Sequence, residues 1–531
     1  MGVAIARRST FRIGVLAALV FATAVAVFAR CVTFQFAYDD RWTIVDNRAL
    51  EGRLAPLLRS VLTGNAALRH VPDSTRPLMV LSMWMDRRLF GLEPAGYHWH
   101  SLLLYGLTTV AAAVVVLAVT RRRFAALAGG LLFAVCPLHA EAVASINYRE
   151  DLQAALAVFG VAACLLLPRR GTETASRAAY AAALAVLGLF GKESAVCVVL
   201  VVPALLLARR ESLATWFASR RTSVFGVSSA VLLWGAYRAL LRALGRDDVP
   251  LALEHRGALE RVLRTCRYGV RTALDGLFPV SWSPEYAPEG PASWLWAVAL
   301  AAVVVVILVL ARRGRSGSVL AAGVLVALVA GLPTSPLVSP INETADRYAF
   351  VATLGGALFW GALFDRATRS LRASLRYASV ALAVVPLAAV AQGAAAPWQS
   401  NDALWACAIE RAPSSPRAWA SWSNILRRRG DLDGAEQAAL RGLAEGPQAF
   451  LPRVSRIYAL LALGKTDEAK AAITELRSVG GGRMPGVRRA VRCAEMSQAE
   501  VAACLDPEAK PRVSAGSGIG VPVPPQATDG D

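Results

Sequence analysis

Residues 292–311 read ASWLWAVALAAVVVVILVLA, without a single charged side chain, and Arg312-Arg313 follows at once. A helix rises about 1.5 Å per residue, so this stretch is long enough to cross a bilayer core about 30 Å thick. An uncharged apolar run of this length is typical of a transmembrane helix. The stretch therefore predicts a membrane protein.

Ten further apolar blocks precede or follow this one within the first 394 residues. They are residues 11–29, 97–119, 124–138, 152–167, 177–191, 194–208, 222–243, 318–333, 348–364 and 374–394. The whole chain is 55% hydrophobic, above the 45–50% that is usual for soluble proteins. We therefore expect an all-α fold, a polytopic membrane helix bundle with about eleven transmembrane helices over residues 1–396.

The formal net charge is +19, and arginine supplies nearly all of it. In a soluble protein this charge would suggest nucleic acid. Here the arginines flank apolar blocks, as in Arg121-Arg122-Arg123 and Arg209-Arg210, which follows the positive-inside rule. We therefore expect no nucleic-acid partner. The preference for arginine over lysine also fits a GC-rich bacterial genome, so we expect a bacterial inner (cell) membrane.

The loops alternate in charge when the N-terminus is placed in the cytoplasm. The basic loops on that side hold Arg121 to Arg123, Arg169-Arg170, Arg209 to Arg221, Arg312 to Arg315, and Arg366 to Arg376. The opposite loops hold Asp39-Asp40, His139 to Glu141, Arg149 to Asp151, Glu285, and Glu343 to Arg347. With eleven crossings this orientation predicts a periplasmic or otherwise extracytoplasmic C-terminal region.

Two other stretches carry too many charges to cross a membrane. Residues 76–92 contain Asp86, Arg87 and Arg88, and residues 258–280 contain four arginines among Leu and Val. Charges at this density are costly at mid-bilayer, so we expect helices lying in the interface plane on the external side.

The segment after the membrane region contains a repeat. Gly430 and Gly464 are 34 residues apart, as are Ala435 and Ala469, which is the tetratricopeptide period. We expect a short α-helical tetratricopeptide-repeat domain over residues 397–480 and a largely disordered C-terminal extension over residues 481–531. Cys493 and Cys504 could pair in an oxidising compartment, or remain free.

Ionisable residues gather in the loops of the predicted external side, where polar groups at membrane depth are candidates for function. The candidates are Asp39, Asp40, His139, Glu141, Arg149, Glu150, Lys192, Glu193, Arg347 and Tyr348. Each has a plainer alternative. Asp39-Asp40 could be a solvated loop pair or helix cap, and His139 a satisfied interface histidine. Lys192-Glu193 could be a self-neutralising turn, and Arg347 a snorkelling side chain.

No nucleotide-binding or zinc motif is present in the sequence, so we expect no nucleotide cofactor. An outward-facing enzyme lacks cytosolic nucleotide sugars. Its activated substrate would then have to arrive in the membrane, attached to a lipid.

Several motifs in order resemble a known family. They are Tyr38-Asp39-Asp40, Arg76-Pro77-Leu78, Gly96-Tyr97-His98, residues 132–143 (LFAVCPLHAEAV), Lys192-Glu193 and Arg347-Tyr348, followed by repeats. This series resembles the transmembrane-and-tetratricopeptide-repeat O-mannosyltransferase family and its bacterial relatives, which look like C-type glycosyltransferases. The resemblance covers roughly residues 30–480.

The resemblance implies a membrane glycosyltransferase with a polyprenyl-phosphate-linked sugar as donor and a hydroxyl as acceptor. Asp39 or Asp40 would act as catalytic base, with His139 and Glu141 assisting. Arg149, Lys192 and Arg347 would bind the lipid phosphate, and Arg76, Glu150, Glu193 and Tyr348 would support them. Two departures stand out: Cys136 stands where the family commonly has His, and the repeat array is short. They affect the donor pocket and acceptor choice respectively.

Three questions stay open at this point. Asp39 and Asp40 could hold a divalent cation, or none is needed. The protein could instead be a non-catalytic membrane-anchored repeat scaffold or envelope assembly factor, with partners bound by the repeats. A transporter for lipid-linked sugars would favour polar residues in the middle of helices.

Overall fold

The computed structural model describes residues 2–64, 76–167, 174–245, 257–337, 344–478, 485–496 and 498–505. These residues form helices and no strand, which confirms the predicted all-α fold. The arginine pair predicted to flank a membrane block, Arg169-Arg170, lies outside the described residues, as does the predicted disordered tail from residue 506.

The chain divides into two compact units, residues Met1–Ala418 and Trp419–Asp531. The first unit holds α1 (Gly2–Phe28), α2 (Leu54–Leu62), α3 (Pro77–Phe90), α4 (Pro94–Thr120), α5 (Arg123–Ala134), α6 (Ala140–Ala144), α7 (Arg149–Leu166), α8 (Ala175–Gly191), α9 (Val198–Arg209), α10 (Leu213–Ala243), α11 (Ala258–Leu277), α12 (Leu295–Arg312), α13 (Gly314–Val329), α14 (Thr353–Ala367), α15 (Ala373–Ala395) and α16 (Asn401–Arg411). The boundary falls inside α17 (Pro416–Arg429).

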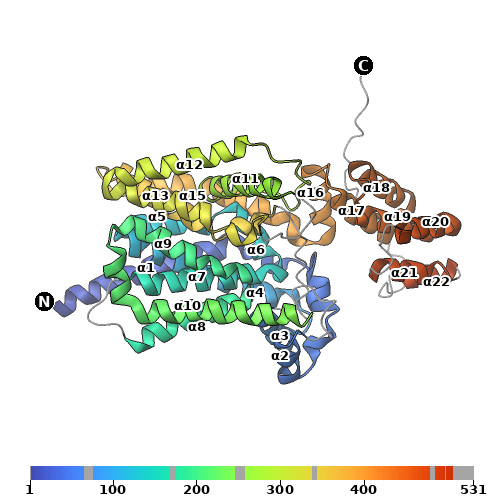
Figure 1. Cartoon of the computed structure of the whole chain (residues 1–531), viewed down its shortest axis with the longest axis horizontal. Coiled ribbons are helices and arrows are strands. Elements are labelled where there is room, and N and C mark those ends of the chain that lie inside the picture. The colour runs from blue at the N-terminus through green and yellow to red at the C-terminus, as the bar shows by residue number, and fades with distance from the viewer. Residues whose placement is uncertain are drawn as a thin grey trace, which may run out of the picture. The chain divides into compact units, whose positions relative to one another are not determined.

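A helix is present at each of the eleven predicted apolar blocks. Six spans, built on α1, α4, α10, α12, α13 and α15, are long and apolar enough to cross a membrane. A seventh is added if α5 and α6, bent by 53° at Pro137, count as one broken span. Figure 1 shows the long helices α4, α7, α8, α10, α12 and α13 running roughly alongside one another. The first unit is therefore a multi-pass membrane helix bundle, while the number of crossings stays a prediction.

Small residues let the helices at the centre of the bundle approach closely. A methyl group added at Gly129 of α5 would overlap the carbonyl oxygen of Ala357 in α14, and one added at Gly356 would overlap that of Gly276 in α11. Helices in lipid gain little from hydrophobicity against one another, so close packing of small residues supplies much of their attraction. The glycines thus fix α5 and α11 against α14.

We expect Gly356→Ala to destabilise the protein by about 1–3 kcal/mol or more, because the added methyl meets backbone that cannot rotate away. The thermal unfolding midpoint of the purified protein in detergent measures this. Gly235→Ala is the matched control, since a methyl there meets no atom within 4 Å in the middle of α10. It should be neutral or slightly stabilising. Equal midpoints for the two variants would contradict the close packing.

The stretches predicted to lie in the interface plane form α3 and α11. Neither belongs to the helices that are long and apolar enough to span a membrane. One face of α11 is buried, including Tyr268, Thr272 and Ala273, and the helix packs on α13 and α14. Their position relative to a bilayer stays a prediction.

The second unit repeats one turn geometry. It contains α18 (Leu432–Glu445), α19 (Phe450–Ala462), α20 (Thr466–Ser478), α21 (Pro485–Cys493) and α22 (Gln498–Leu505). Gly430 and Gly464 both have positive φ, and each is followed by a residue whose N–H donates back to the preceding helix. A positive φ is easiest for glycine, which explains both positions. The 34-residue spacing therefore corresponds to two equivalent helix hairpins, as the repeat prediction requires.

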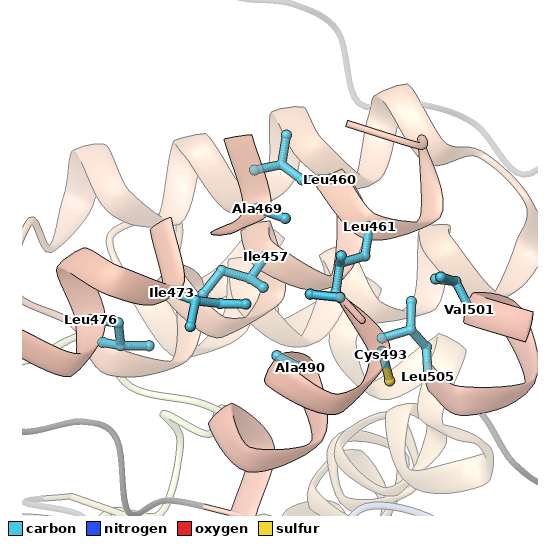
Figure 2. Close-up of a cluster of buried hydrophobic side chains, with 11 residues drawn as sticks. Ile457, Leu460, Leu461, Ala469, Ile473, Leu476, Ala490, Cys493, Val501 and Leu505 are labelled. Atoms are coloured by element: carbon cyan, nitrogen blue, oxygen red, sulfur yellow. The ribbon is translucent and has the colours of Figure 1, made fainter. Parts of the chain in front are cut away.

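Part of the predicted extension, residues 481–531, is helical where it is described. Figure 2 shows Ala490, Cys493, Val501 and Leu505 of α21 and α22 facing Ile457 and Leu461 of α19 in one buried cluster. Cys493 and Cys504 form a disulfide. We expected disorder because the segment is mostly polar, but its helices carry a short apolar face. This face and the disulfide together hold α21 and α22 against the repeats.

Candidate functional site

The loop after α1 separates the two neighbouring aspartates into different environments. Asp40 is fully buried, and its two carboxylate oxygens accept hydrogen bonds from the backbone N–H of Asn147 at 2.7 Å and of Ala37 at 3.1 Å. Asp39 is partly exposed, and its carbonyl oxygen accepts from the N–H groups of Trp42 and Thr43. Asp40 thus holds the loop against the turn before α7, whereas the side chain of Asp39 lies within reach of solvent.

Binding of a divalent cation by Asp39 and Asp40 stays a prediction. Each carboxylate oxygen of Asp40 accepts one backbone hydrogen bond, so part of its capacity to ligate a metal is already used. No group of three or more His, Cys, Asp or Glu side chains in the described parts of the chain is placed to hold one. We therefore derive no step through a metal.

Burial raises the pKa of Asp40 from 3.8 to about 7, against the opposing effect of its backbone hydrogen bonds. Because the folded-state pKa lies above the unfolded one, the stabilisation from the neutral acid is present below pH 3.8. It is lost as the pH rises toward 7. We expect a loss on the order of 4 kcal/mol across this window. Thermal midpoints measured from pH 4 to pH 8 should fall and then level off, and Asp40→Asn should flatten the profile. A wild-type midpoint that rises over this window would contradict the prediction.

Tyr38 fixes the loop on its other side. Its backbone N–H donates to Oδ1 of Asn401 at 2.7 Å, and its hydroxyl accepts from Nη1 of Arg417 at 2.8 Å. Its ring packs against Trp398 and Trp405. Burial raises the pKa of Tyr38 to about 12, although Arg417 opposes the shift. Tyr38 is therefore a neutral aromatic support beside Asp39.

Arg347 lies behind this loop. Its backbone N–H donates to Oε2 of Glu141 at 3.0 Å, and its guanidinium pairs with Oε1 of the same carboxylate. The guanidinium also stacks on the ring of Tyr148, 3.9 Å from its centroid, and Tyr148 in turn contacts Tyr38. The sequence prediction brought Asp39, Glu141 and Arg347 to one region, and the structure joins that region through Tyr38 and Tyr148.

A second ion-pair network surrounds Lys192. Its Nζ lies 2.7 Å from Asp151 and 3.0 Å from Glu150. Arg76 bridges Glu150 at 2.5 Å and Glu193 at 2.7 Å. Three carboxylates thus share two cations. Burial lowers the pKa of Lys192, but Asp151 and Glu150 outweigh this effect and the pKa is raised, with Arg76 and Arg347 acting in the opposite direction. The predicted residues Arg76, Glu150, Lys192 and Glu193 therefore form one chain of charges that also senses the charge of Arg347.

Arg149 belongs to a different cluster. It is fully buried, with its guanidinium 2.5 Å from Asp86, 3.1 Å from Ser101 and 2.8 Å from the carbonyl of Tyr97. These partners lie on α3 and α4. In the described residues the guanidinium of Arg149 makes no contact with the ammonium of Lys192 or the guanidinium of Arg347, and its phosphate-binding role stays a prediction.

His139 also lies apart from the loop. Its two ring nitrogens are 2.9 Å from the hydroxyl of Tyr105 and 2.8 Å from that of Thr353, and its ring packs between Phe133 and Phe350. It is fully buried. The geometry supports the plainer reading of a satisfied histidine that ties α5, α4 and α14 together, and the proton-donor role stays untested.

The structure adds a basic cleft beside Tyr348 that the sequence analysis missed. Its charged lining is Arg264, Arg267, Arg271, Asp275 and Glu289, and about 430 Å³ of space, open solvent included, is free of protein atoms. Three arginines against two acids give the lining a net charge of +1. All three arginines are in ion pairs, because Glu289 pairs with Arg267 at 2.6 Å and with Arg271, and Glu260 pairs with Arg264 at 2.6 Å. Burial raises the pKa of Asp275 to about 6, with Arg271 opposing. The four arginines of residues 258–280 were the available signal. They predicted an interfacial helix that could shape an acceptor groove, but not a charged cleft.

An apolar groove lies on the other side of α11. It is lined almost wholly by carbon, from Leu132 and Phe133 of α5, Leu277 and Phe278 at the end of α11, and Trp360 of α14, with about 760 Å³ free of protein atoms. Cys136 also lines it. Cys136, which stands where the resembled family commonly has His, thus faces an apolar groove.

Comparison with curated proteins finds relatives of one kind. Over 134 residues the chain is 35% identical to the protein O-mannosyl-transferase Tmtc1 of Drosophila melanogaster, which is 25% of this chain and 16% of that protein. It is 33% identical over 146 residues to human TMTC1, covering 26% of this chain and 16% of the relative. It is 32% identical over 180 residues to Drosophila Tmtc2, covering 31% and 19%.

The resemblance drawn from the motifs is confirmed by these relatives, all of which are named protein O-mannosyl-transferases. The matched stretch spans less than a fifth of the relatives' length in each of the three. No family profile matches the chain, and no solved structure matches it. The expected C-type glycosyltransferase fold therefore stays an expectation beyond the helix bundle described above.

Proposed function

We propose that this protein is a membrane glycosyltransferase that moves a mannose-like hexose from a polyprenyl-phosphate-linked donor to a Ser or Thr hydroxyl of a protein. The proposal places the reaction on the external face of a bacterial inner membrane. Its main support is the similarity to protein O-mannosyl-transferases in a chain whose Asp39 is partly exposed and follows Tyr38. The ring of Tyr38 contacts Tyr148, on which the buried Arg347 stacks.

Asp39 is the candidate base. Its carboxylate would take the acceptor hydroxyl proton as that oxygen bonds to the anomeric carbon, while the bond from this carbon to the phosphate oxygen breaks. The leaving phosphate keeps the electron pair of that bond. One in-line displacement inverts the sugar configuration. Asp40 suits this role less well, because both its oxygens are occupied and it is sealed from solvent.

The leaving phosphate needs positive charge in a partly desolvated place, where such contacts are strong. Arg347, fixed by Glu141 and Tyr148, offers one buried cation. Arg264, Arg267 and Arg271 offer further ones in the cleft beside Tyr348. Arginine suits this task because its planar guanidinium can donate two parallel bonds to phosphate oxygens. The apolar groove, lined almost wholly by carbon, offers a surface for the prenyl chain.

The test is transfer by the purified protein in liposomes that contain a polyprenyl-phosphate mannose, with a Ser/Thr-rich peptide as acceptor. We expect a hexose on the peptide, in the inverted anomeric configuration, with activity that persists in EDTA. A nucleotide sugar alone should give no product. Retention of configuration, or no transfer to any hydroxyl from any polyprenyl-phosphate hexose, would overturn the proposal.

A further inference from the structure

A second arginine-lined pocket lies at the other end of the bundle from the candidate site. α4 begins near the cluster of Arg149 and ends at Thr120, and a helix of its 27 residues is about 40 Å long. α14 likewise begins at Thr353, which contacts His139, and runs to Asp365 and Arg366. The far ends of these two helices line the pocket, so it is separate from the candidate catalytic region.

The pocket is strongly positive. Five arginines and one aspartate line it, a net charge of +4: they are Arg121, Arg122, Arg315, Arg366, Arg369 and Asp365. The single acid is already neutralised, because Asp365 is buried and its oxygens lie 3.0 Å from Arg369 and 2.9 Å from Arg376. Within the described part of the chain, Arg122, Arg315 and Arg366 form no ion pair. Three guanidinium groups therefore face the pocket without a carboxylate partner.

Backbone geometry adds to this charge. α5 begins at Arg123 and α13 at Gly314, so two helix N-termini open toward the pocket, where Arg122, Arg315 and Ser316 line it. Helix N-termini carry partial positive charge and unsatisfied N–H donors. Arg121 has a left-handed φ of 57°, an uncommon conformation for a residue with a Cβ. The N–H of Arg122 donates to the hydroxyl of Thr120 at 3.2 Å, which holds this turn in place.

The remaining lining is apolar and belongs to helices of the bundle. Ala125, Val319, Leu320, Ala362 and Leu363 form the wall below the arginines, and about 830 Å³ of the pocket is free of protein atoms. A free anion needs only the charged rim. A phosphate attached to a hydrophobic body can use both the rim and the wall.

We propose that this pocket binds the phosphate headgroup of an anionic membrane lipid, with phosphatidylglycerol as the simplest probe. Basic pockets between the ends of membrane helices are suited to such headgroups, and each arginine near an anionic lipid adds about 1 kcal/mol to the binding free energy. The positive-inside pattern accounts for exposed arginines at this end in general. Arg121 lies 3.7 Å from Glu211, so three of the five lining arginines have no acidic partner in the described residues. The positive-inside pattern does not account for a cavity that combines these three arginines, an acid already neutralised and two helix N-termini. The inference does not depend on the proposed transferase activity.

The experiment compares binding to the full-length protein in detergent, read by the thermal midpoint on titration with phosphatidylglycerol, phosphatidylcholine or inorganic phosphate. Phosphatidylglycerol should stabilise the wild type, and the other two should have little effect. The variant R122Q/R315Q/R366Q should need about a hundredfold more phosphatidylglycerol for the same shift. The control R210Q/R312Q/R372Q removes the same charge from exposed arginines that do not line the pocket, and should behave as wild type.

If both triple variants lost stabilisation by phosphatidylglycerol equally, the lipid would be attracted by surface charge in general. That result would overturn the proposal of a binding pocket. Equal stabilisation by inorganic phosphate would overturn the lipid assignment. If the triple variant does not fold in phosphatidylcholine-containing micelles, Arg315→Gln alone provides the same comparison against Arg312→Gln. An unchanged phosphatidylglycerol response in Arg315→Gln would then count against the proposal.

Discussion

Asp39→Asn is expected to lower the rate of sugar transfer by about 10²–10⁴-fold, the usual contribution of a positioned general base. The amide keeps the shape of the side chain but cannot accept the acceptor proton. The aspartate is partly exposed, and its neighbours Tyr38 and Asp40 are held by the rest of the bundle, so the loop should keep its conformation. The measurement is the initial rate of hexose transfer in liposomes with saturating donor.

Asp46→Asn is the matched control, because this acid lies in the same loop and pairs with Arg41 at 3.1 Å in a partly exposed place. It should keep nearly full activity, since such pairs contribute little. The thermal unfolding midpoint of Asp39→Asn should equal that of wild type. A reduced transfer rate would then reflect a catalytic defect and not a loss of stability. Full transfer by Asp39→Asn would remove this residue from the mechanism.

Glu141→Gln is expected to lower the free energy of unfolding by about 3–5 kcal/mol, because it leaves the buried guanidinium of Arg347 without a counter-charge. Glu141 accepts from both the guanidinium and the backbone N–H of Arg347, so the variant also loses a charge-assisted bond in the turn before α14. Chemical or thermal unfolding of the purified protein measures the loss.

Two comparisons separate the buried pair from a general charge effect. Glu51→Gln removes a partner of Arg87 at 2.5 Å, yet Glu51 is 57% exposed, so its loss should cost no more than about 1 kcal/mol. The double variant E141L/R347M removes both charges and should recover most of the stability lost in Glu141→Gln. A double variant no more stable than Glu141→Gln would mean that the pair itself is not the cause.

Local composition was enough to place the helices. Residues 292–311 and the ten other apolar blocks each contain a helix, because uncharged runs of this length depend on no distant contact to become helical. The motif order also placed Tyr38, Glu141 and Arg347 in one region. The repeat spacing placed the turns at Gly430 and Gly464.

The partner of each charge could not be predicted in the same way. Arg76 and Glu193 are 117 residues apart, and Arg347 and Glu141 are 206 apart, so only the packed bundle decides these pairs. His139 was predicted from a motif, yet its surroundings are aromatic rings from α5 and the start of α14. The sequence did not predict that the arginines of α11 line a cleft, because this depends on which face of α11 lies toward Tyr348.

The bond between Tyr38 and Asn401 joins positions 363 residues apart. A ribosome makes the first of them long before the second, so the loop that holds Asp39 cannot reach its final shape while most of the chain is still being translated. Products that stop before residue 401 would insert in the membrane with that loop unsupported. A chain that ends before residue 401 would thus lack the backbone hydrogen bond that holds Tyr38 beside Asp39.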